Sequence, residues 1–339
     1  MKDKIIIYGA SGYVGKLLIK QLTQSQIPFI TAGRSANKDV EIDLVCSLTS
    51  QTEIVENIKG AVMLINLAGP FSETSNPLIE ACIKAKVHYF DIAGEYNEFK
   101  SAHKYHSAAK EAGVMIMPGI GFGVVPTDIA AYLASKLIKD PTHLSICYGT
   151  KGGASRGTLR TVLRDINSPG VRIQDGNAIL AAPASEEKRI VVDGDEKTFV
   201  LNPWRGDLFS AGVTTGIKNI TTYTEFPGII VSMMQGKMLF LRNLLLKHII
   251  KFLPEGPNEK QLCSGSTYIN AEVTNANNEK ANVIITGPEA YKFTVYCIEK
   301  VISEIQNHPA LSGFQTPSVL GHEFLKSIPQ VEIKQIKQP

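Results

Sequence analysis

Apolar runs and amphipathic segments alternate along the first 120 residues of the chain. Short continuous apolar runs are typical of buried strands, and apolar residues spaced three or four apart are typical of helices. The runs predict strands at 4–8, 27–31, 62–67, 87–92 and 114–118, and the spacing predicts helices at 12–24, 50–58, 75–86 and 97–112. Strands that alternate with helices predict an α/β domain, in which a Rossmann-type parallel sheet is covered on both faces.

The pattern changes beyond Asp140. Alternating strands are predicted at 143–149, 188–201, 219–225, 266–274 and 281–286, with only a few helices between them. This predicts an α+β second domain with a mostly antiparallel sheet. We therefore expect a nucleotide-binding domain over 1–140, with 308–330 packing back on it, and a substrate or oligomerisation domain over 141–307.

The segment IIIYGASGYVG at 5–15 joins the first strand to the first helix. Its glycines, Gly9, Gly12 and Gly15, have the spacing G-x-x-G-x-x-G, which lets backbone N–H groups approach a pyrophosphate at the helix N-terminus. Ala10 and Leu17 replace the first glycine and the Ser/Thr of a phosphate-binding Walker loop. The spacing predicts dinucleotide binding, and a plain tight turn is the alternative.

The end of the second strand indicates which dinucleotide is bound. An NAD site usually has an acidic residue here for the ribose 2′-hydroxyl. This chain has Gly33, Arg34 and Ser35 instead, and a guanidinium beside a hydroxyl suits a 2′-phosphate. We expect NADP(H), the alternative being that Arg34 is a solvated loop residue.

The composition is that of a soluble globular protein, with 44% hydrophobic and 20% charged residues. The net charge of +3 gives no reason to expect nucleic acid as a partner. Five cysteines are scattered without a CxxC pair, which indicates reduced thiols and no metal site. The start, MKDKIIIYG, runs directly into the first strand without a signal peptide, so we expect a cytoplasmic protein.

Seven segments in order resemble the saccharopine dehydrogenase-like oxidoreductases, especially the branch of trans-acting enoyl reductases. They are GASGYVG at 9–15, NLAGPFSETSNPLIEACIKAKVHYFDIAGE at 66–95, PGIGFGVVPTDIAAYLA at 118–134, GGASRGTLRTVL at 152–163, EGPNEKQL at 255–262, TGPEAYKFT at 286–294 and SGFQTPSVLG at 312–321. The resemblance implies a Rossmann-type NADP domain, a second domain that covers the cleft, and a homodimer. The resemblance also implies cofactor contacts at Gly9, Ser11, Gly12, Tyr13, Val14, Arg34, Ala68, Gly69, Pro70 and Gly94. The glycine pattern adds Gly15 to these contacts, and the loop after the second strand adds Ser35.

The candidate proton donors follow the strand at 87–92. Tyr89 and Asp91 alternate with His88 and Phe90, so the two pairs point to opposite faces of the sheet. Asp91 can equally hold the following loop by accepting backbone N–H bonds. Glu95 lies in that loop, and our catalytic candidates are Glu95, Tyr96 and Tyr89, with loop structure as the alternative for Glu95.

The candidate substrate contacts are Phe71, which follows the Ala68–Pro70 loop, and Lys151, Ser155 and Arg156, which open a helix of the second domain. Arg156, Arg160 and Arg164 form one stripe along that helix. A site for a carboxylate or phosphate is one interpretation. A solvated basic face with an ordinary serine cap is the other.

Residues 226–253 form a long apolar segment studded with cations. Lys237, Lys247, His248 and Lys251 cluster on one side of a helical projection, with Arg242 opposite. Such a segment can pack against protein, form a homodimer interface, line an acyl channel or contact a membrane surface peripherally.

Together these features predict an NADP-dependent oxidoreductase that transfers a hydride to an apolar acyl substrate such as an enoyl thioester. An imine reductase acting on an amino-acid-derived substrate is one alternative, and a non-catalytic NADP-binding sensor or scaffold is the other.

Overall fold

The computed structural model describes residues 4–338 apart from 165, 193, 246–247, 249 and 308–310. The described chain divides into two compact units. The first comprises 1–125 and 291–319, and the second comprises 126–290 and 320–339.

The first unit is built on a seven-stranded sheet with the order β15-β6-β5-β4-β1-β2-β3, counted over the described residues. All its strand pairs are parallel. The strands are β1 Ile5–Tyr8, β2 Ile30–Gly33, β3 Leu44–Val45, β4 Met63–Asn66, β5 His88–Asp91, β6 Met115–Met117 and β15 Gly313–Phe314. Side chains on β1 and β4 are completely buried, as expected for a parallel sheet covered on both faces.

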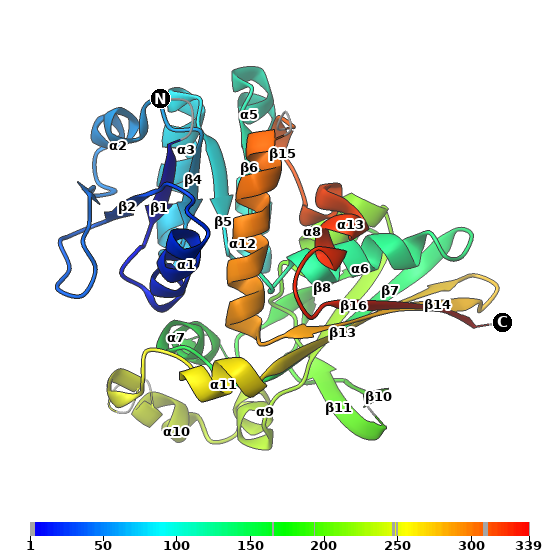
Figure 1. The fold of residues 1–339 in the computed structure, drawn as a ribbon. Coiled ribbons are helices and arrows are strands. Elements are labelled where there is room, and N and C mark those ends of the chain that lie inside the picture. The colour runs from blue at the N-terminus through cyan, green and yellow to red at the C-terminus, as the bar shows by residue number, and fades with distance from the viewer. Residues whose placement is uncertain are drawn as a thin grey trace. The chain divides into compact units, whose positions relative to one another are not determined.

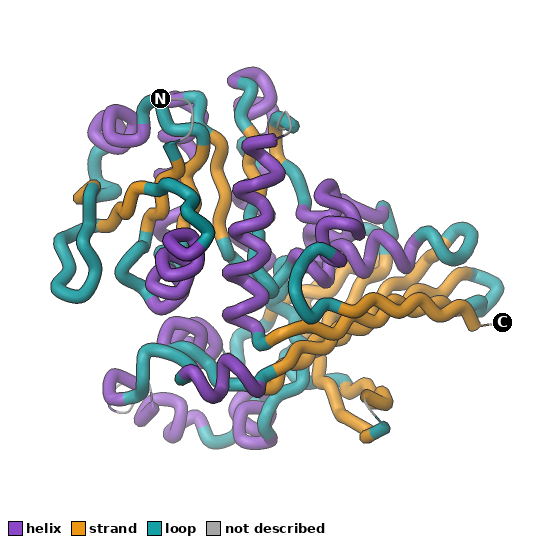
Figure 2. Tube along the Cα trace, viewed as in Figure 1, coloured by secondary structure: helices purple, strands orange, loops and turns teal. Residues whose placement is uncertain are grey.

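Helices connect these strands (Figures 1 and 2). They are α1 Tyr13–Gln24, α2 Gln51–Ile58, α3 Phe71–Ala85, α4 Tyr96–His103, α5 His106–Ala112 and α12 Ala290–Asn307, of which α12 joins this unit from Tyr291 onward. The predicted helix at 97–112 is two helices, because the chain turns at Lys104 and Tyr105.

The second unit has a nine-stranded mixed sheet in the described chain, with β10-β11-β12-β7-β13-β14-β16 as its main path and β8 and β9 attached at β12. The strands are β7 Pro141–Lys151, β8 Gly170–Gln174, β9 Asn177–Ala181, β10 Glu187–Val192, β11 Asp195–Leu201, β12 Asn219–Thr224, β13 Ser266–Asn275, β14 Lys280–Pro288 and β16 Glu332–Gln338. The pairing is antiparallel except between β7 and β12. The prediction of a mostly antiparallel second sheet is confirmed.

Short helices accompany this sheet. They are α6 Val125–Ser135, α7 Arg156–Arg164, α8 Asp207–Thr215, α9 Gly228–Met234, α10 Leu239–Leu244, α11 Glu259–Ser264, α13 Gly321–Lys326 and the 3₁₀ turn η2 Ile250–Phe252. The 3₁₀ turn η3 Pro317–Leu320 lies where the chain passes from the first unit to the second. No helix of the described residues combines the length and the apolar character needed to cross a bilayer.

The division of the structure differs from the sequence-based one at two places. The first unit ends at Val125 rather than at 140, and it takes in α12, which the sequence assigned to the second domain. Of the segment predicted to pack back, Gly313 and Phe314 pair with β6, whereas 320–330 belong to the second unit and 308–310 lie outside the described residues.

Candidate functional site: a dinucleotide cradle

The turn after β1 requires glycine at two positions. Gly9 has φ +88°, and a Cβ there would lie 2.7 Å from the backbone nitrogen of Ala68. A Cβ on Gly15 would overlap the carbonyl oxygen of Ala10 and lie 2.6 Å from that of Gly9. The two glycines therefore bring β1, the next helix and the loop after β4 into backbone contact.

The third glycine leaves the start of α1 open. Gly12 is the N-cap residue and is exposed, and no side chain caps the helix. A Cβ added to Gly12 would come within 4 Å of the Gly9 carbonyl oxygen alone, at 3.3 Å. The first turn of α1 contains no acidic residue. Backbone N–H groups and the helix dipole thus favour an anion here, which fits the pyrophosphate of a dinucleotide.

The end of β2 fits a 2′-phosphate. Arg34 and Ser35 are exposed directly after the strand. The carboxylate of Asp43 accepts hydrogen bonds from the backbone N–H and the hydroxyl of Thr31, at 2.9 and 2.8 Å, so it is committed to the strand. Asp39 is paired with Lys16 at 3.7 Å.

A buried polar network follows β4 and β5, and the sequence did not predict it. Asn66 is fully buried, and its amide group donates to the hydroxyls of Thr74 at 3.0 Å and Tyr89 at 3.2 Å. Its oxygen accepts the backbone N–H of Ala68 at 3.0 Å. The Thr74 hydroxyl donates to the Ala68 carbonyl at 2.7 Å. An asparagine ending an otherwise apolar strand was the signal for this network.

Asp91 joins the network at the end of β5. Its carboxylate accepts the hydroxyl of Tyr89 at 2.8 Å and the backbone N–H groups of Ala93 at 2.9 Å and Gly119 at 3.0 Å. Burial raises the pKa of Asp91 to about 6, partly offset by these hydrogen bonds. Asp91 therefore holds the loops after β5 and β6, which is the structural role that its sequence position allowed.

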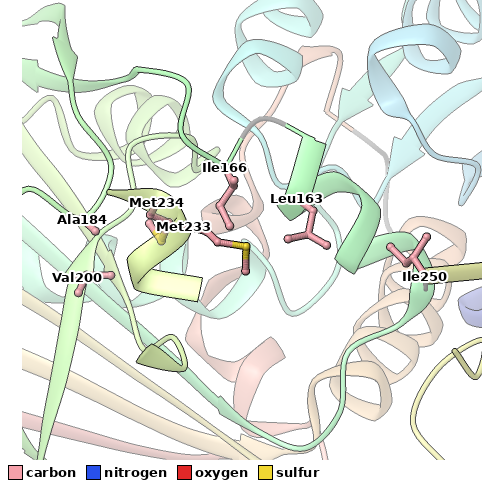
Figure 3. Close-up of a cluster of buried hydrophobic side chains, with 7 residues drawn as sticks. All are labelled: Leu163, Ile166, Ala184, Val200, Met233, Met234 and Ile250. Carbon is pink, nitrogen blue, oxygen red and sulfur yellow. The ribbon is translucent and has the colours of Figure 1, made fainter. Parts of the chain in front are cut away.

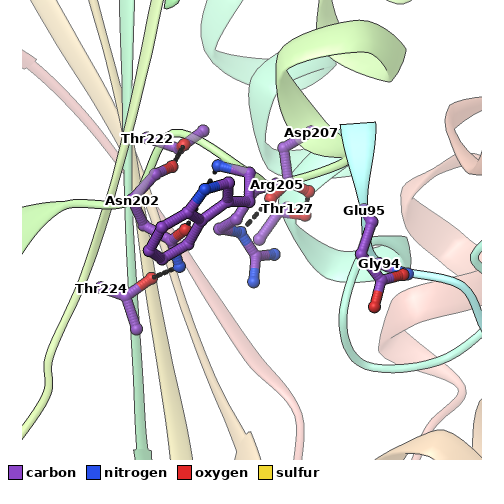
Figure 4. A network of polar contacts seen from close by, with 9 residues as sticks. Gly94, Glu95, Thr127, Asn202, Arg205, Asp207, Thr222 and Thr224 are labelled. Carbon is purple, nitrogen blue, oxygen red and sulfur yellow. Dashed lines mark hydrogen bonds and ion pairs between the residues drawn. The ribbon is translucent and has the colours of Figure 1, made fainter. Parts of the chain in front are cut away.

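The three predicted catalytic residues have different surroundings. Tyr89 is completely buried, and burial raises its pKa. Glu95 and Tyr96 are half-buried at the start of α4, where the N–H of Gly94 donates to Glu95 Oε2 at 2.8 Å (Figure 4). A proton donor must reach solvent or substrate. Burial therefore favours Glu95 and Tyr96 over Tyr89, and the catalytic role of all three stays a prediction.

The predicted nicotinamide loop, Ala68–Phe71, runs from β4 into α3. Its Gly69–Pro70 peptide bond is cis, Pro70 is the N-cap of α3, and Phe71 is the first helical residue. Gly69 is exposed, and Ala68, Pro70 and Phe71 are half-buried. The cofactor contacts of Ala68, Gly69, Pro70 and Gly94 stay predictions from the sequence. So does the substrate contact of Phe71.

In the second unit, the predicted anion site is partly occupied by the protein itself. Ser155 is buried, and its Oγ accepts the N–H of Thr158 at 3.1 Å, as an N-cap does. The guanidinium of Arg156 donates to the carbonyl of Leu253 at 3.1 and 2.7 Å. Lys151 is exposed at the end of β7. These contacts favour a structural role for Ser155 and Arg156.

A buried ion pair in the second unit was not predicted (Figure 4). Arg205 Nε pairs with Asp207, which is fully buried and also accepts the hydroxyl of Thr127. The guanidinium lies 4.0 Å from the centre of the Tyr148 ring. Asp207, Tyr148 and hydrogen bonding raise the pKa of Arg205 against the opposing effect of burial. Beside it, Asn202 donates to Thr224 at 3.0 Å.

Comparison with known proteins decides the family of the first unit. The family model for the saccharopine dehydrogenase NADP binding domain matches residues 5–117. Residues 5–117 thus resemble a saccharopine dehydrogenase NADP-binding domain. The match covers the glycine turn, the Arg34 loop and β4 to β6, and it confirms NADP(H) as the cofactor.

Individual relatives are similar to parts of the chain. The chain is 27% identical over 161 residues to a saccharopine dehydrogenase-like oxidoreductase of Bos taurus. This alignment covers 39% of this chain and 38% of that protein. It is 29% identical over 154 residues to a trans-acting enoyl reductase of Mycobacterium leprae, covering 41% of this chain and 37% of that protein. These two alignments thus span less than two fifths of either relative.

One solved structure extends the likeness of fold beyond the NADP-binding domain. Apo saccharopine dehydrogenase (L-Glu forming) of Saccharomyces cerevisiae superimposes with a TM-score of 0.63 at 10% identity, covering 99% of this chain and 100% of that one. The fold predicted from the sequence, a Rossmann-type unit followed by an α+β unit, is therefore confirmed for the whole chain.

Proposed function

We propose that this protein is an NADP-dependent oxidoreductase whose substrate is an apolar acyl compound such as an enoyl thioester. The observation that carries the proposal is the combination of the open glycine turn with Arg34 at the end of β2, inside an NADP-binding domain. The trans-acting enoyl reductase of Mycobacterium leprae is a relative over 41% of this chain, and this supports the acyl substrate.

Each part of the proposed site has a task. NADPH supplies a hydride when bound. Gly9, Gly12 and the α1 N-terminus hold its pyrophosphate, and Arg34 holds the 2′-phosphate. Glu95 or Tyr96 holds the proton that the reduced substrate takes up. Asp91 positions the loop that carries them, because it binds the N–H of Ala93.

Two competing functions make different demands. An imine reductase acting on an amino-acid-derived substrate needs cations for the substrate carboxylates. The Arg156 guanidinium, one such candidate, already binds the carbonyl of Leu253, and this favours the acyl substrate. A non-catalytic sensor or scaffold would need the cradle alone and would leave NADPH unconsumed.

The cofactor assignment is tested with Arg34→Asp. We expect weaker NADPH binding and a shift of preference toward NADH, because the new carboxylate repels the 2′-phosphate and suits a ribose hydroxyl. Lys38→Asp, an exposed change of the same charge in the same loop, is the control. Unchanged affinity and selectivity in Arg34→Asp would defeat the assignment of Arg34.

The substrate class is tested by following NADPH consumption with enoyl thioesters and, separately, with imines formed from amino acids. Turnover of the thioesters alone supports the proposal, and turnover of the imines alone refutes its substrate. Glu95→Gln and Tyr96→Phe should lower kcat, with Glu111→Gln, an exposed change on α5, as the control. A Glu95→Gln variant with full turnover would remove Glu95 from the catalytic residues.

The proposal includes a cytoplasmic homodimer. Four of the five cysteines are buried, which suits a reducing compartment. Fractionation of cells and light scattering of the purified protein test these two points, and a secreted protein or a monomer would contradict them.

A further inference from the structure

The segment between β12 and α11 has one buried side and one exposed side. On its buried side Met233, Met234 and Ile250 pack with Leu163 and Ile166 of the α7 region (Figure 3). Arg242 donates to the carbonyl of Leu163 at 2.8 Å and so fastens the segment further. The segment is therefore firmly attached to the second unit.

The exposed side chains of this segment include apolar and basic ones. Phe240 is 73% exposed on α10, and Leu244, four residues later on the same helical face, is 45% exposed. Phe252 is 80% exposed, and the ammonium of Lys251 lies 5.0 Å from the centre of its ring. Lys237 is exposed just before α10. We call Lys237, Phe240, Leu244, Lys251 and Phe252 the basic apolar surface.

The charge of the segment is predominantly basic. Residues 225–258, between β12 and α11, contain the cations Lys237, Arg242, Lys247 and Lys251 and two acidic residues, Glu225 and Glu255. Lys247 lies outside the described residues. Four cations less two carboxylates give this segment a net charge of +2, compared with +3 for the whole chain.

This charge distribution selects the partner. A twofold dimer through the basic apolar surface would bury its lysines in the interface, and Glu225, one of the two acidic residues of the segment, already pairs with Lys197 at 3.3 Å. Lysine is also depleted from the cores of protein interfaces. Exposed phenylalanine and leucine flanked by lysine instead match an anionic bilayer, whose acyl boundary takes the apolar groups and whose headgroups take the ammonium groups.

We propose that the basic apolar surface binds the protein to anionic membranes as a peripheral contact. All residues of the basic apolar surface belong to the second unit, whereas the NADP-binding residues belong to the first. Attraction to the headgroups is screened by salt, so binding weakens as the ionic strength rises.

The test is flotation of the full-length protein with vesicles of phosphatidylcholine, with and without phosphatidylserine. We expect flotation with the phosphatidylserine vesicles only. Phe240→Ser with Phe252→Ser should abolish it, and Lys237→Glu or Lys251→Glu should each weaken partitioning by about fivefold or more. Leu180→Ser is the matched apolar control, because Leu180 is 80% exposed on β9, and Lys110→Glu is the charge control.

Circular dichroism and NADPH binding of each variant establish that it is folded. Failure of the wild-type protein to float, or full flotation of the paired phenylalanine variant, would overturn the proposal. A wild-type dimer that the same variant converts to monomer, with no flotation in either, would identify a second copy as the occupant and would also overturn it.

Discussion

Gly15→Ala tests the backbone contact on which the dinucleotide cradle depends. Real Cβ atoms do not approach other atoms closer than 3.0 Å, yet a Cβ on Gly15 would lie 2.6 Å from the Gly9 oxygen and closer still to that of Ala10. Both neighbours are backbone atoms of the turn, so neither can rotate away. Overpacking of this kind costs about 3 kcal/mol at the upper end, and the better helix propensity of alanine returns about 1 kcal/mol. We expect a net loss of about 2 kcal/mol.

The matched control is Gly157→Ala in α7, where the nearest atom to the new Cβ is Ser155 Oγ at 3.7 Å. That contact is ordinary, so the same substitution should stabilise the protein by up to about 1 kcal/mol. Urea unfolding followed by far-UV circular dichroism measures both changes. Trp204, the only tryptophan of the sequence, belongs to the second unit, and its fluorescence separates the unfolding of the two units.

Gly15→Ala should also weaken NADPH binding at least tenfold. A Gly15→Ala protein with wild-type stability and wild-type affinity would refute the reasoning.

Three further predictions concern buried polar groups. His88 Nδ1 accepts the backbone N–H of Met115 at 3.0 Å and burial lowers its pKa, so the free energy of unfolding should fall as the pH drops below about 6.5. His88→Asn keeps an acceptor and should flatten this dependence, and an unchanged pH dependence in this variant would contradict the role of His88. Asp91→Ala should destabilise the first unit by about 2–4 kcal/mol, because it removes the acceptor of Tyr89, Ala93 and Gly119; a loss below about 1 kcal/mol would contradict this network. Arg205→Met should lower the free energy of unfolding by about 3–5 kcal/mol, because it leaves the Asp207 carboxylate buried without its cation. Arg189→Met, in the exposed pair with Glu196, should lower it by less than about 1 kcal/mol. Equal losses in the two variants would contradict this difference between buried and exposed pairs.

The sequence predicted those features of the fold that depend on neighbouring residues. The strand before Gly9, the helix after Gly12 and the strands at 62–67 and 87–92 follow from local apolar patterns, and the structure has them as β1, α1, β4 and β5. Strand pairing between distant segments was not predicted. The segment 308–330 was expected to pack back on the first domain, but the pairing of Gly313 with Met115 across about two hundred residues was not predicted, nor was β16 as a strand of the second sheet. No local pattern in the sequence predicts such a strand pairing.

The same distinction applies to the site. Gly9, Gly12, Gly15 and Arg34 could be proposed from the sequence because their spacing has a local physical meaning for a bound dinucleotide. The contact between Thr127 and Asp207 joins residues eighty positions apart, and neither residue stands out in its own segment. Asn66 lies between these cases, since its local signal, a polar residue ending an apolar strand, was present in the sequence.

The dissociation constants of the wild-type protein for NADPH and NADH, measured by titration of the nicotinamide fluorescence, test the central claim most directly. The arrangement of Arg34 and the glycine turn predicts that NADPH binds at least tenfold more tightly than NADH. Equal affinities, or tighter binding of NADH, would contradict the assignment of the cradle to NADP.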